Sequence, residues 1–186
     1  MTNTIDYDFG RTQRLVAGVD AARAIAAETQ KLGAQRVFVM ASASTLADGH
    51  LASDLKSNLG RRLAGIHSGI AAHAPQQDIL DAAEAARTAQ ADILVAIGGG
   101  TPIDSTKIIQ LCLTHDITDK DQLTQYAQGG GEAGLPIDPK VRDIRTVAVP
   151  TTLSGAEFAS LAGALVVEKK QKQGFSHPDL APIAII

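Results

Sequence analysis

The chain has 186 residues, of which 45% are hydrophobic, so it is long enough to bury one substantial core. Its net charge of −3 provides no general attraction for nucleic acid or for an anionic membrane surface. An aromatic content of 3%, without Trp, also excludes the stacking platforms that bind single-stranded nucleic acid. We therefore expect the partner to be a small-molecule substrate, and neither nucleic acid nor a membrane.

Cys112 is the only cysteine, which rules out an intrachain disulfide and a cysteine-based metal cluster. The sequence shows neither the pattern of a signal peptide nor an apolar run long enough to span a membrane. These features favour a reducing, cytoplasmic location.

Taken in chain order, apolar runs of strand length alternate with Ala-rich stretches of helical period. The first helix is predicted to begin with Asp20 as its cap and to stop at Gly33. Helices are predicted over residues 20–32, 46–59, 76–90 and 103–113, and strands over residues 36–40, 63–66, 93–97 and 146–149. This alternation is typical of an α/β fold in which helices cover the faces of a mostly parallel sheet.

The last third of the chain is less regular. Residues 116–142 mix charged residues with three consecutive glycines and two prolines, which predicts a long loop with at most one helical turn. Apolar residues at 164–167 and 182–186, with a polar turn at 168–174, predict a hairpin or a pair of edge strands. The apolar run 181–186 either enters the sheet as its last strand or indicates that this chain is one half of a larger enzyme.

Three consecutive glycines, 98–100, join the strand predicted over 93–97 to the helix that follows it. Residues without Cβ allow the backbone to approach an anion closely, and the first amides of a helix are unpaired donors at the positive end of its dipole. Thr101, Pro102 and Asp104 are predicted to be the N-cap, the first helical residue and the acid of a capping box. The segment differs from G-x-G-x-x-G and from G-x-x-x-x-G-K-[ST], but it suits a diphosphate and indicates a dinucleotide enzyme.

A second loop of small and hydroxyl residues, 151–157, follows the strand predicted over 146–149. Ligands of open α/β sheets bind beyond the carboxyl ends of the strands, so the two loops are expected to face one crevice. We expect Gly99, Gly100 and Thr101 to hold the diphosphate. The hydroxyls of Thr151, Thr152 and Ser154 would then add donors toward the phosphates or the nicotinamide. The alternative is that both segments are only tight loops.

Three charged residues near these loops each have two interpretations. The carboxylate of Asp104 either caps its own helix or contacts a ligand. Lys107 can pair with Asp104 or reach a phosphate, although a solvated helix lysine is the commoner outcome. Lys172 belongs to a polar stretch that is most often an exposed turn, but a lysine there can also close over a cofactor.

The five histidines contain no H-E-x-x-H pair or other close ligand pair, so we predict no metal site in this chain. His73 follows a predicted strand and precedes Pro75, a position from which its side chain would point toward the crevice. An ordinary loop histidine is the alternative. Ser154 lacks the G-x-S-x-G context of a hydrolase nucleophile.

These residues resemble the group III, iron-containing alcohol dehydrogenase family, whose pattern is G-G-G-S-x-x-D-x-x-K followed by P-T-T. Residues 98–107 and 150–152 match it, with Thr101 in place of the serine. The finer resemblance is to maleylacetate reductases, through P-T-T-L-S-G-A-E at 150–157 and the histidine-bearing segment 72–75. The similarity extends from about residue 9 to residue 186.

The resemblance implies a Rossmann-like, dehydroquinate synthase-like N-terminal domain over residues 1–186, without the helical C-terminal catalytic domain of the family. It implies NAD(P)H-dependent hydride transfer to maleylacetate, giving 3-oxoadipate in aromatic degradation, by a homodimeric complete enzyme that needs no metal in this chain. His73 would contact substrate. The cofactor-binding residues would be Gly99, Gly100, Thr101, Asp104, Thr151, Thr152, Ser154 and Lys172.

Other outcomes stay open. A metal-dependent alcohol or glycerol dehydrogenase, or a dehydroquinate synthase-like lyase, would share this domain, and a non-catalytic nucleotide-binding module is a further alternative. NAD-preferring relatives often carry an aspartate after the strand that corresponds to 36–40, whereas this chain has Ala-Ser-Ala-Ser at 41–44. Without that carboxylate, we expect both NADH and NADPH to be accepted.

Overall fold

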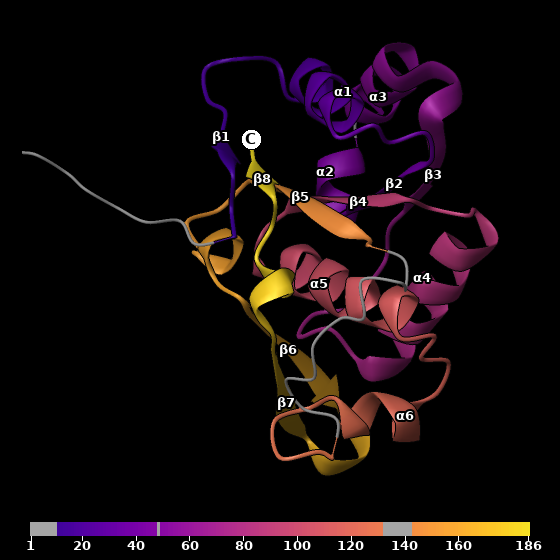
Figure 1. The fold of residues 1–186 in the computed structure, drawn as a ribbon, viewed down its shortest axis with the longest axis vertical. Helices are drawn as coiled ribbons and strands as arrows, with labels where there is room; N and C mark the ends of the chain where they lie inside the picture. The colour runs from indigo at the N-terminus through magenta and orange to yellow at the C-terminus, as the bar shows by residue number, and fades with distance from the viewer. Residues whose placement is uncertain (1–10, 48, 132–142) are drawn as a thin grey trace, which may run out of the picture.

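The computed structural model describes residues 11–47, 49–131 and 143–186, and its centre is a six-stranded parallel sheet (Figure 1). Each neighbouring pair of strands is parallel. The predicted α/β class is therefore confirmed. In spatial order the strands are β1 (Arg14–Leu15), β8 (Ala184–Ile185), β5 (Arg145–Pro150), β4 (Ile93–Gly98), β2 (Val37–Ala41) and β3 (Leu63–His67).

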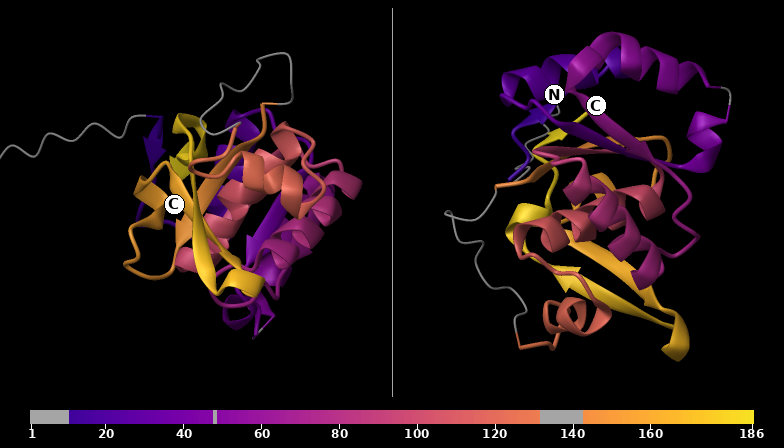
Figure 2. Two further views of the ribbon diagram at one scale, coloured as in Figure 1. Left: turned by 90° about the horizontal axis from the view of Figure 1, so that it is seen from below. Right: turned by 90° about the vertical axis from the view of Figure 1, so that its right-hand side faces the viewer.

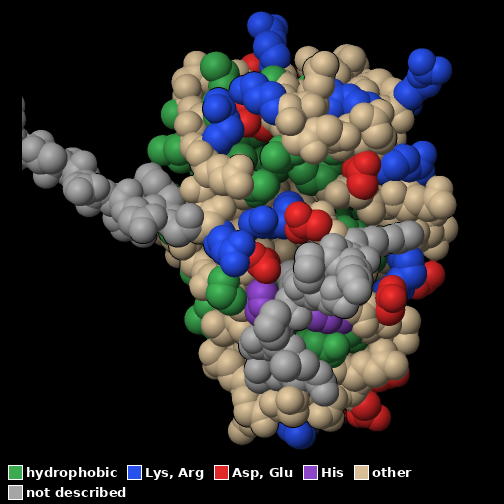
Figure 3. All heavy atoms as spheres, in the orientation of Figure 1, with side chains coloured by type: hydrophobic (Ala, Val, Ile, Leu, Met, Phe, Trp, Pro, Cys, Tyr) green, Lys and Arg blue, Asp and Glu red, His purple; other side chains and the backbone are tan. Residues whose placement is uncertain are grey.

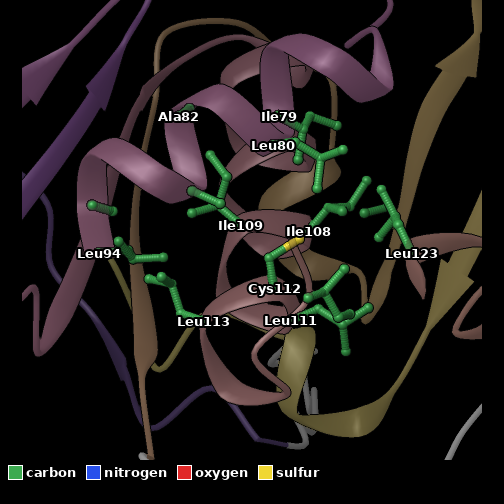
Figure 4. Packing of buried hydrophobic residues seen from close by; sticks show 14 of the residues in the cluster. Ile79, Leu80, Ala82, Leu94, Ile108, Ile109, Leu111, Cys112, Leu113 and Leu123 are labelled. Atoms are coloured by element: carbon green, nitrogen blue, oxygen red, sulfur yellow. The ribbon is translucent and has the colours of Figure 1, made fainter. Parts of the chain in front are cut away.

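Helices cover both faces of the sheet, so strand residues are buried on either side. In β2, Val37 and Val39 enter one apolar core and Phe38 and Met40 the other, as expected for a parallel sheet covered on both faces. The first core lies under α1 (Ala21–Lys31) and α3 (His50–Leu59), and the second under α4 (Gln76–Thr88) and α5 (Gly100–Thr114) (Figures 1 and 4).

Local signals explain where these helices begin and end. Asp20 is the N-cap of α1 and accepts a hydrogen bond from the amide of Arg23 at 2.9 Å, while Gly33 has a φ of +77° just after the helix. The single helix predicted over 46–59 is wrong. A short helix α2 (Ala43–Leu46) comes first, and Gly49, with a φ of +73°, separates it from α3.

A hairpin forms a second, two-stranded antiparallel sheet from β6 (Leu161–Val166) and β7 (Gln171–Ser176). The predicted hairpin is thus present, but residues 182–186 are not part of it, because β8 pairs with β1 and β5 in the main sheet. Within the predicted loop 116–142 lies α6 (Lys120–Gln125), and residues 132–142 of that loop are outside the described residues. The described residues also contain four 3-10 turns: η1 (Gly60–Arg62), η2 (Ala156–Phe158), η3 (Val167–Lys169) and η4 (Pro178–Leu180).

The hairpin lies on the far side of α5 from the main sheet, so α5 is enclosed between two sheets (Figure 2). The amide of Leu165 in β6 donates to the carbonyl of Ala74 at 2.9 Å, and the Gln76 side chain donates to Gln173 at 2.7 Å. These contacts fix the hairpin to the loop and helix that follow β3. No helix in the described parts of the chain is long and apolar enough to cross a membrane.

Candidate functional site

The glycine turn connects β4 to α5 at the carboxyl edge of the sheet. Gly98 ends the strand with a φ of +142°, Gly99 is the N-cap, and the helix begins at Gly100. The prediction of Thr101 as N-cap is therefore wrong, since Thr101 and Pro102 are already the second and third helical residues. Pro102 is tolerated there because the first-turn amide that it lacks would have no acceptor within the helix.

Gly98 is required by its surroundings, and Gly99 lies close to the neighbouring loop. A Cβ on Gly98 would lie 2.5 Å from Cγ of Pro102, in a backbone region that other residues rarely adopt. A Cβ on Gly99 would lie 3.0 Å from Oγ1 of Thr152. The glycine turn, residues 98–100, is thus folded tightly on itself. It packs against the loop of residues 151–157, called the Thr-rich loop below.

The structure brings the two loops together, because β4 and β5 are neighbours and Gly98 pairs with Pro150 in register. The amide of Thr151 donates to the carbonyl of Gly98 at 2.9 Å. A Cβ on Gly100 would lie 3.5 Å from Cβ of Ser154, so this serine faces the first turn of α5. The two loops are therefore adjacent, and the single crevice that they were expected to face stays a prediction.

The combined site has the chemistry of an anion cradle. Among the first amides of α5, those of Gly100 and Thr101 have no acceptor within the helix, and the helix dipole adds positive potential there. Thr151, Thr152 and Ser154 are exposed, so their hydroxyls can donate to a ligand. Positive and negative side chains are interspersed on the face drawn in Figure 3.

A cavity of about 470 Å³ is bordered by Ser154 of the Thr-rich loop and by residues of the hairpin. Asp104 and Ser154 border it on one side, and Gly163, Lys172 and Gly174 on the other. Gly163 and Gly174 pair across the hairpin, and the side chains of Lys172 and Gln128 lie against them. Sequence reasoning missed these hairpin glycines, although paired glycines within strands are a signal for close approach.

Asp104 does not cap its own helix, which corrects that interpretation. It is the fifth residue of α5, and its Oδ2 accepts a hydrogen bond from the amide of Gly163 in β6 at 3.3 Å. Burial raises the pKa of the Asp104 carboxyl, while Lys107, the Gly163 amide and Lys172 act in the opposite direction. Asp104 therefore joins the cradle helix to the hairpin wall of the cavity.

Lys107 is not the solvated lysine that its sequence position favoured. Its side chain is fully buried, and its Nζ donates to the carbonyls of Ala156, Ala159 and Leu161 at 2.5, 2.6 and 3.1 Å. Burial lowers the pKa of Lys107 to about 8, and the carboxylates of Asp104 and Glu157 limit this decrease. The apolar residues on all sides of α5 were the sequence signal that this helix is enclosed.

Lys172 lies within β7 and not in a turn, because the strand begins at Gln171. Its side chain is exposed, borders the cavity, and lies close enough to Asp104 to lower the pKa of that carboxyl. Whether Lys172 closes over a cofactor stays a prediction.

His73 is placed in the loop after β3, exposed and with a φ of +68°. The next residue, Ala74, is buried and bonded to the hairpin, so the loop itself is well anchored. His73 is not among the described residues that line the cavity of Asp104 and Lys172. Its role in substrate contact stays a prediction, as do the roles of the cofactor-site residues.

Comparison with known proteins gives a family match over nearly the whole chain: residues 12–186 match iron-containing alcohol dehydrogenase. Dehydrogenase FUM7 of Gibberella moniliformis is 33% identical over 162 residues, which are 84% of this chain and 38% of that protein. Maleylacetate reductase 2 of Cupriavidus pinatubonensis is 33% identical over 150 residues, which are 81% of this chain and 33% of that protein.

The fold is shared with solved structures. Sulfoacetaldehyde reductase from Bifidobacterium kashiwanohense, solved in complex with NAD+, superposes with a TM-score of 0.77 at 20% identity, over 97% of this chain and 45% of that chain. The chain thus spans less than half the length of the proteins that it matches. By its family match over residues 12–186, the chain belongs to the iron-containing alcohol dehydrogenase family.

Proposed function

We propose that this chain is the NAD(P)H-binding domain of an oxidoreductase. One observation carries the proposal. The amides at the start of α5, which have no acceptor within the helix, lie directly beside the Thr-rich loop, and Thr152 packs on Gly99. A diphosphate placed there would receive main-chain donors from Gly99, Gly100 and Thr101. The hydroxyls of Thr151, Thr152 and Ser154 would supply further donors from the opposite side.

The neighbouring cavity suits the nicotinamide half of the cofactor. Asp104 and Lys172 both border it and offer an acceptor and a donor. NAD(P)H supplies the hydride when it is bound. The chain's own residues bind and orient the cofactor, and the hairpin closes one side of the cavity against water.

For the complete enzyme we propose reduction of maleylacetate to 3-oxoadipate. One hydride from NAD(P)H and one proton are added across the activated carbon–carbon double bond, and NAD(P)+ is released. The support is the 33% identity to a maleylacetate reductase together with the loop 150–157. Groups that bind the two substrate carboxylates would come mainly from the additional length that the relatives possess.

A second candidate is a dehydrogenase that acts on another substrate, because a protein named only as a dehydrogenase is also 33% identical. The family name implies iron. No three His, Cys, Asp or Glu side chains are grouped as metal ligands among residues 11–47, 49–131 and 143–186. An iron ion would therefore need ligands from outside these residues.

We also propose that both NADH and NADPH are accepted. Ser42 follows β2 and lies beside the glycine turn, since a Cβ on Gly98 would be 3.4 Å from its Oγ. Ser42 and Thr101 border a cavity of about 130 Å³, and the Ser42 hydroxyl contacts those of Ser44 and Thr45. These neutral hydroxyls can donate to a 2′-phosphate, whereas a carboxylate would repel it.

Calorimetric titration of the 186-residue chain with NADH, NADPH and ADP-ribose tests the binding proposal. We expect saturable heat with all three ligands, because each carries the diphosphate. Absence of heat with all of them would contradict it. For the complete enzyme, loss of NADH absorbance should be much faster with maleylacetate than NAD+ reduction with a simple alcohol, and the reverse order would favour the second candidate.

A further inference from the structure

Lys107 is fully buried in α5, an unusual state for a lysine, which is almost never enclosed unless its charge is matched. An ammonium group has three N–H donors. Three carbonyl oxygens lie within 3.1 Å of Nζ, those of Ala156, Ala159 and Leu161. Each donor of the ammonium therefore has its own acceptor.

The three acceptors belong to one short segment, residues 156–161, which follows the Thr-rich loop and leads into β6. Ala156, Ala159 and Leu161 also border the cavity beside the cradle. The Lys107 side chain of α5 thus holds the segment that connects the Thr-rich loop to the hairpin. Asp104, one turn earlier, adds a second link through its hydrogen bond with the amide of Gly163.

We propose that Lys107 is a positioning residue of the cofactor site, whose ammonium fixes residues 156–161 and so sets the Thr-rich loop against the glycine turn. This inference rests on the proposed function for its consequence in binding. The positioning itself concerns the protein without cofactor. Lys107 touches neither cofactor nor substrate in this role.

The charge state of Lys107 matters because a neutral amine has only two donors and a lone pair. It would leave one of the three carbonyls without a donor. The groups that face this ammonium are Asp104 from α5 and Glu157 from η2, both of which favour its charged form, while Lys172 from β7 faces Asp104. With its pKa lowered to about 8, Lys107 loses its proton at moderately alkaline pH. The hold on residues 156–161 should weaken there.

Lys107→Met and Lys107→Gln remove the charge, and Lys56→Met, at an exposed position on α3, is the matched control. We expect Lys107→Met to weaken NADH binding by about tenfold or more, since the loop must then be ordered at the expense of binding free energy. The NADH affinity of wild type should fall above about pH 8, and that of Lys107→Gln should not change with pH. A merely structural role would leave the two plots of NADH affinity against pH parallel. Lys56→Met should match wild type throughout.

A spin label attached to Leu153→Cys reports the mobility of the Thr-rich loop in the absence of cofactor. Leu153 is fully exposed, and the only native thiol, Cys112, is buried with its pKa raised to about 12, so labelling is selective. We expect a more mobile label in Lys107→Met, and in wild type at about pH 10 compared with about pH 7.

Unchanged label mobility, together with NADH affinity within about twofold of wild type in a folded Lys107→Met, would overturn the inference. If that variant does not fold, the wild-type label decides, because a spectrum independent of pH overturns it equally. Failure of the proposed function looks different. The wild-type chain would then bind no NADH, while the label would still respond to Lys107.

Discussion

Helices α3 and α5, which cover opposite faces of the main sheet, bury different kinds of side chain. On one face, α3 contributes only Leu55 and Leu59 as buried residues, which pack on valines and isoleucines of the strands. On the other face, α5 buries Lys107 and Gln110 among its apolar residues. Gln110 donates to the carbonyl of Asp179 at 2.7 Å and accepts from the Thr146 hydroxyl at 2.8 Å.

The difference follows from what each helix must hold. Apolar packing is non-directional, so it stabilises a helix on a sheet without fixing a loop at a particular distance. Hydrogen bonds are directional. Asp104 accepts one from the hairpin, Lys107 donates to the segment before the hairpin, and Gln110 donates to the connection to β8. Helix α5, which carries the candidate site, therefore uses buried polar side chains where geometry matters, whereas α3 contributes apolar packing.

The largest expected effect comes from the apolar cores themselves. Leu55→Ala and Ile108→Ala, one on each face, should each lower the free energy of unfolding by about 2–5 kcal/mol, because each leaves a cavity. Urea denaturation measures this loss. Only Ile108→Ala should also weaken NADH binding of the folded chain, since it loosens α5. Equal loss of affinity in both variants would contradict the distinction between α3 and α5.

The next effect tests the cradle. Gly98→Ala places a Cβ 2.5 Å from Cγ of Pro102 at a φ of +142°. We expect NADH affinity to fall by about thirtyfold or more, with a loss of about 1–3 kcal/mol in the free energy of unfolding from backbone strain. Gly18→Ala is a control with a positive φ but open space around it, and it should affect only stability. Calorimetry with NADH that finds Gly98→Ala and Gly18→Ala equally competent would contradict the role of the turn.

The buried lysine predicts a pH dependence of stability with a defined sign. The pKa of Lys107 falls from 10.5 to about 8 on folding, so between these values the unfolded chain binds a proton that the folded chain does not. The contribution of this group to the free energy of unfolding therefore rises with pH in that window, by about 1–3 kcal/mol, because the burial penalty of the charge disappears. This gain in global stability accompanies the local loss of one hydrogen bond to residues 156–161.

Denaturation of wild type and Lys107→Gln from about pH 7 to about pH 10 measures this contribution. The free energy of unfolding of wild type should rise with pH relative to that of Lys107→Gln. Lys56→Gln, which alters an exposed lysine, should give a constant difference. Parallel curves for wild type and Lys107→Gln would mean that Lys107 does not change its pKa on folding.

The smallest expected effect concerns cofactor choice at the end of β2. Ser42→Asp places a carboxylate beside the glycine turn, where it should repel a 2′-phosphate and accept bonds from a ribose. NADPH affinity should fall by about tenfold while NADH affinity stays within about twofold. Ser57→Asp on the exposed side of α3 is the control for added charge. Equal loss of both cofactors in Ser42→Asp would place the adenosine elsewhere.

Periodicity and turn chemistry were sufficient to predict most of the fold. The strand at 93–97 and the helix capped by Asp20 depend on neighbouring residues, so both could be predicted from local sequence. The break at Gly49 was missed, because an isolated glycine within a helical pattern is often tolerated. The position of β8 depends on pairing with strands far away in sequence, which no local pattern contains.

The candidate site was predictable in composition but not in detail. The glycine turn and the Thr-rich loop could be placed together, since both follow neighbouring parallel strands. Lys107 looked like a surface residue, because the segment that encloses it lies about fifty residues later in the chain. Thr101 resembled an N-cap, but Gly99 takes that place because α5 begins at the glycine itself.

The most direct test of the diphosphate cradle is a titration of the isotope-labelled chain with ADP-ribose, followed through its amide resonances. The account predicts that the largest shifts occur at the amides of Gly99, Gly100 and Thr101, with smaller shifts at residues 151–154. Saturable binding that leaves these amides unperturbed and moves resonances at the opposite edge of the sheet would contradict it.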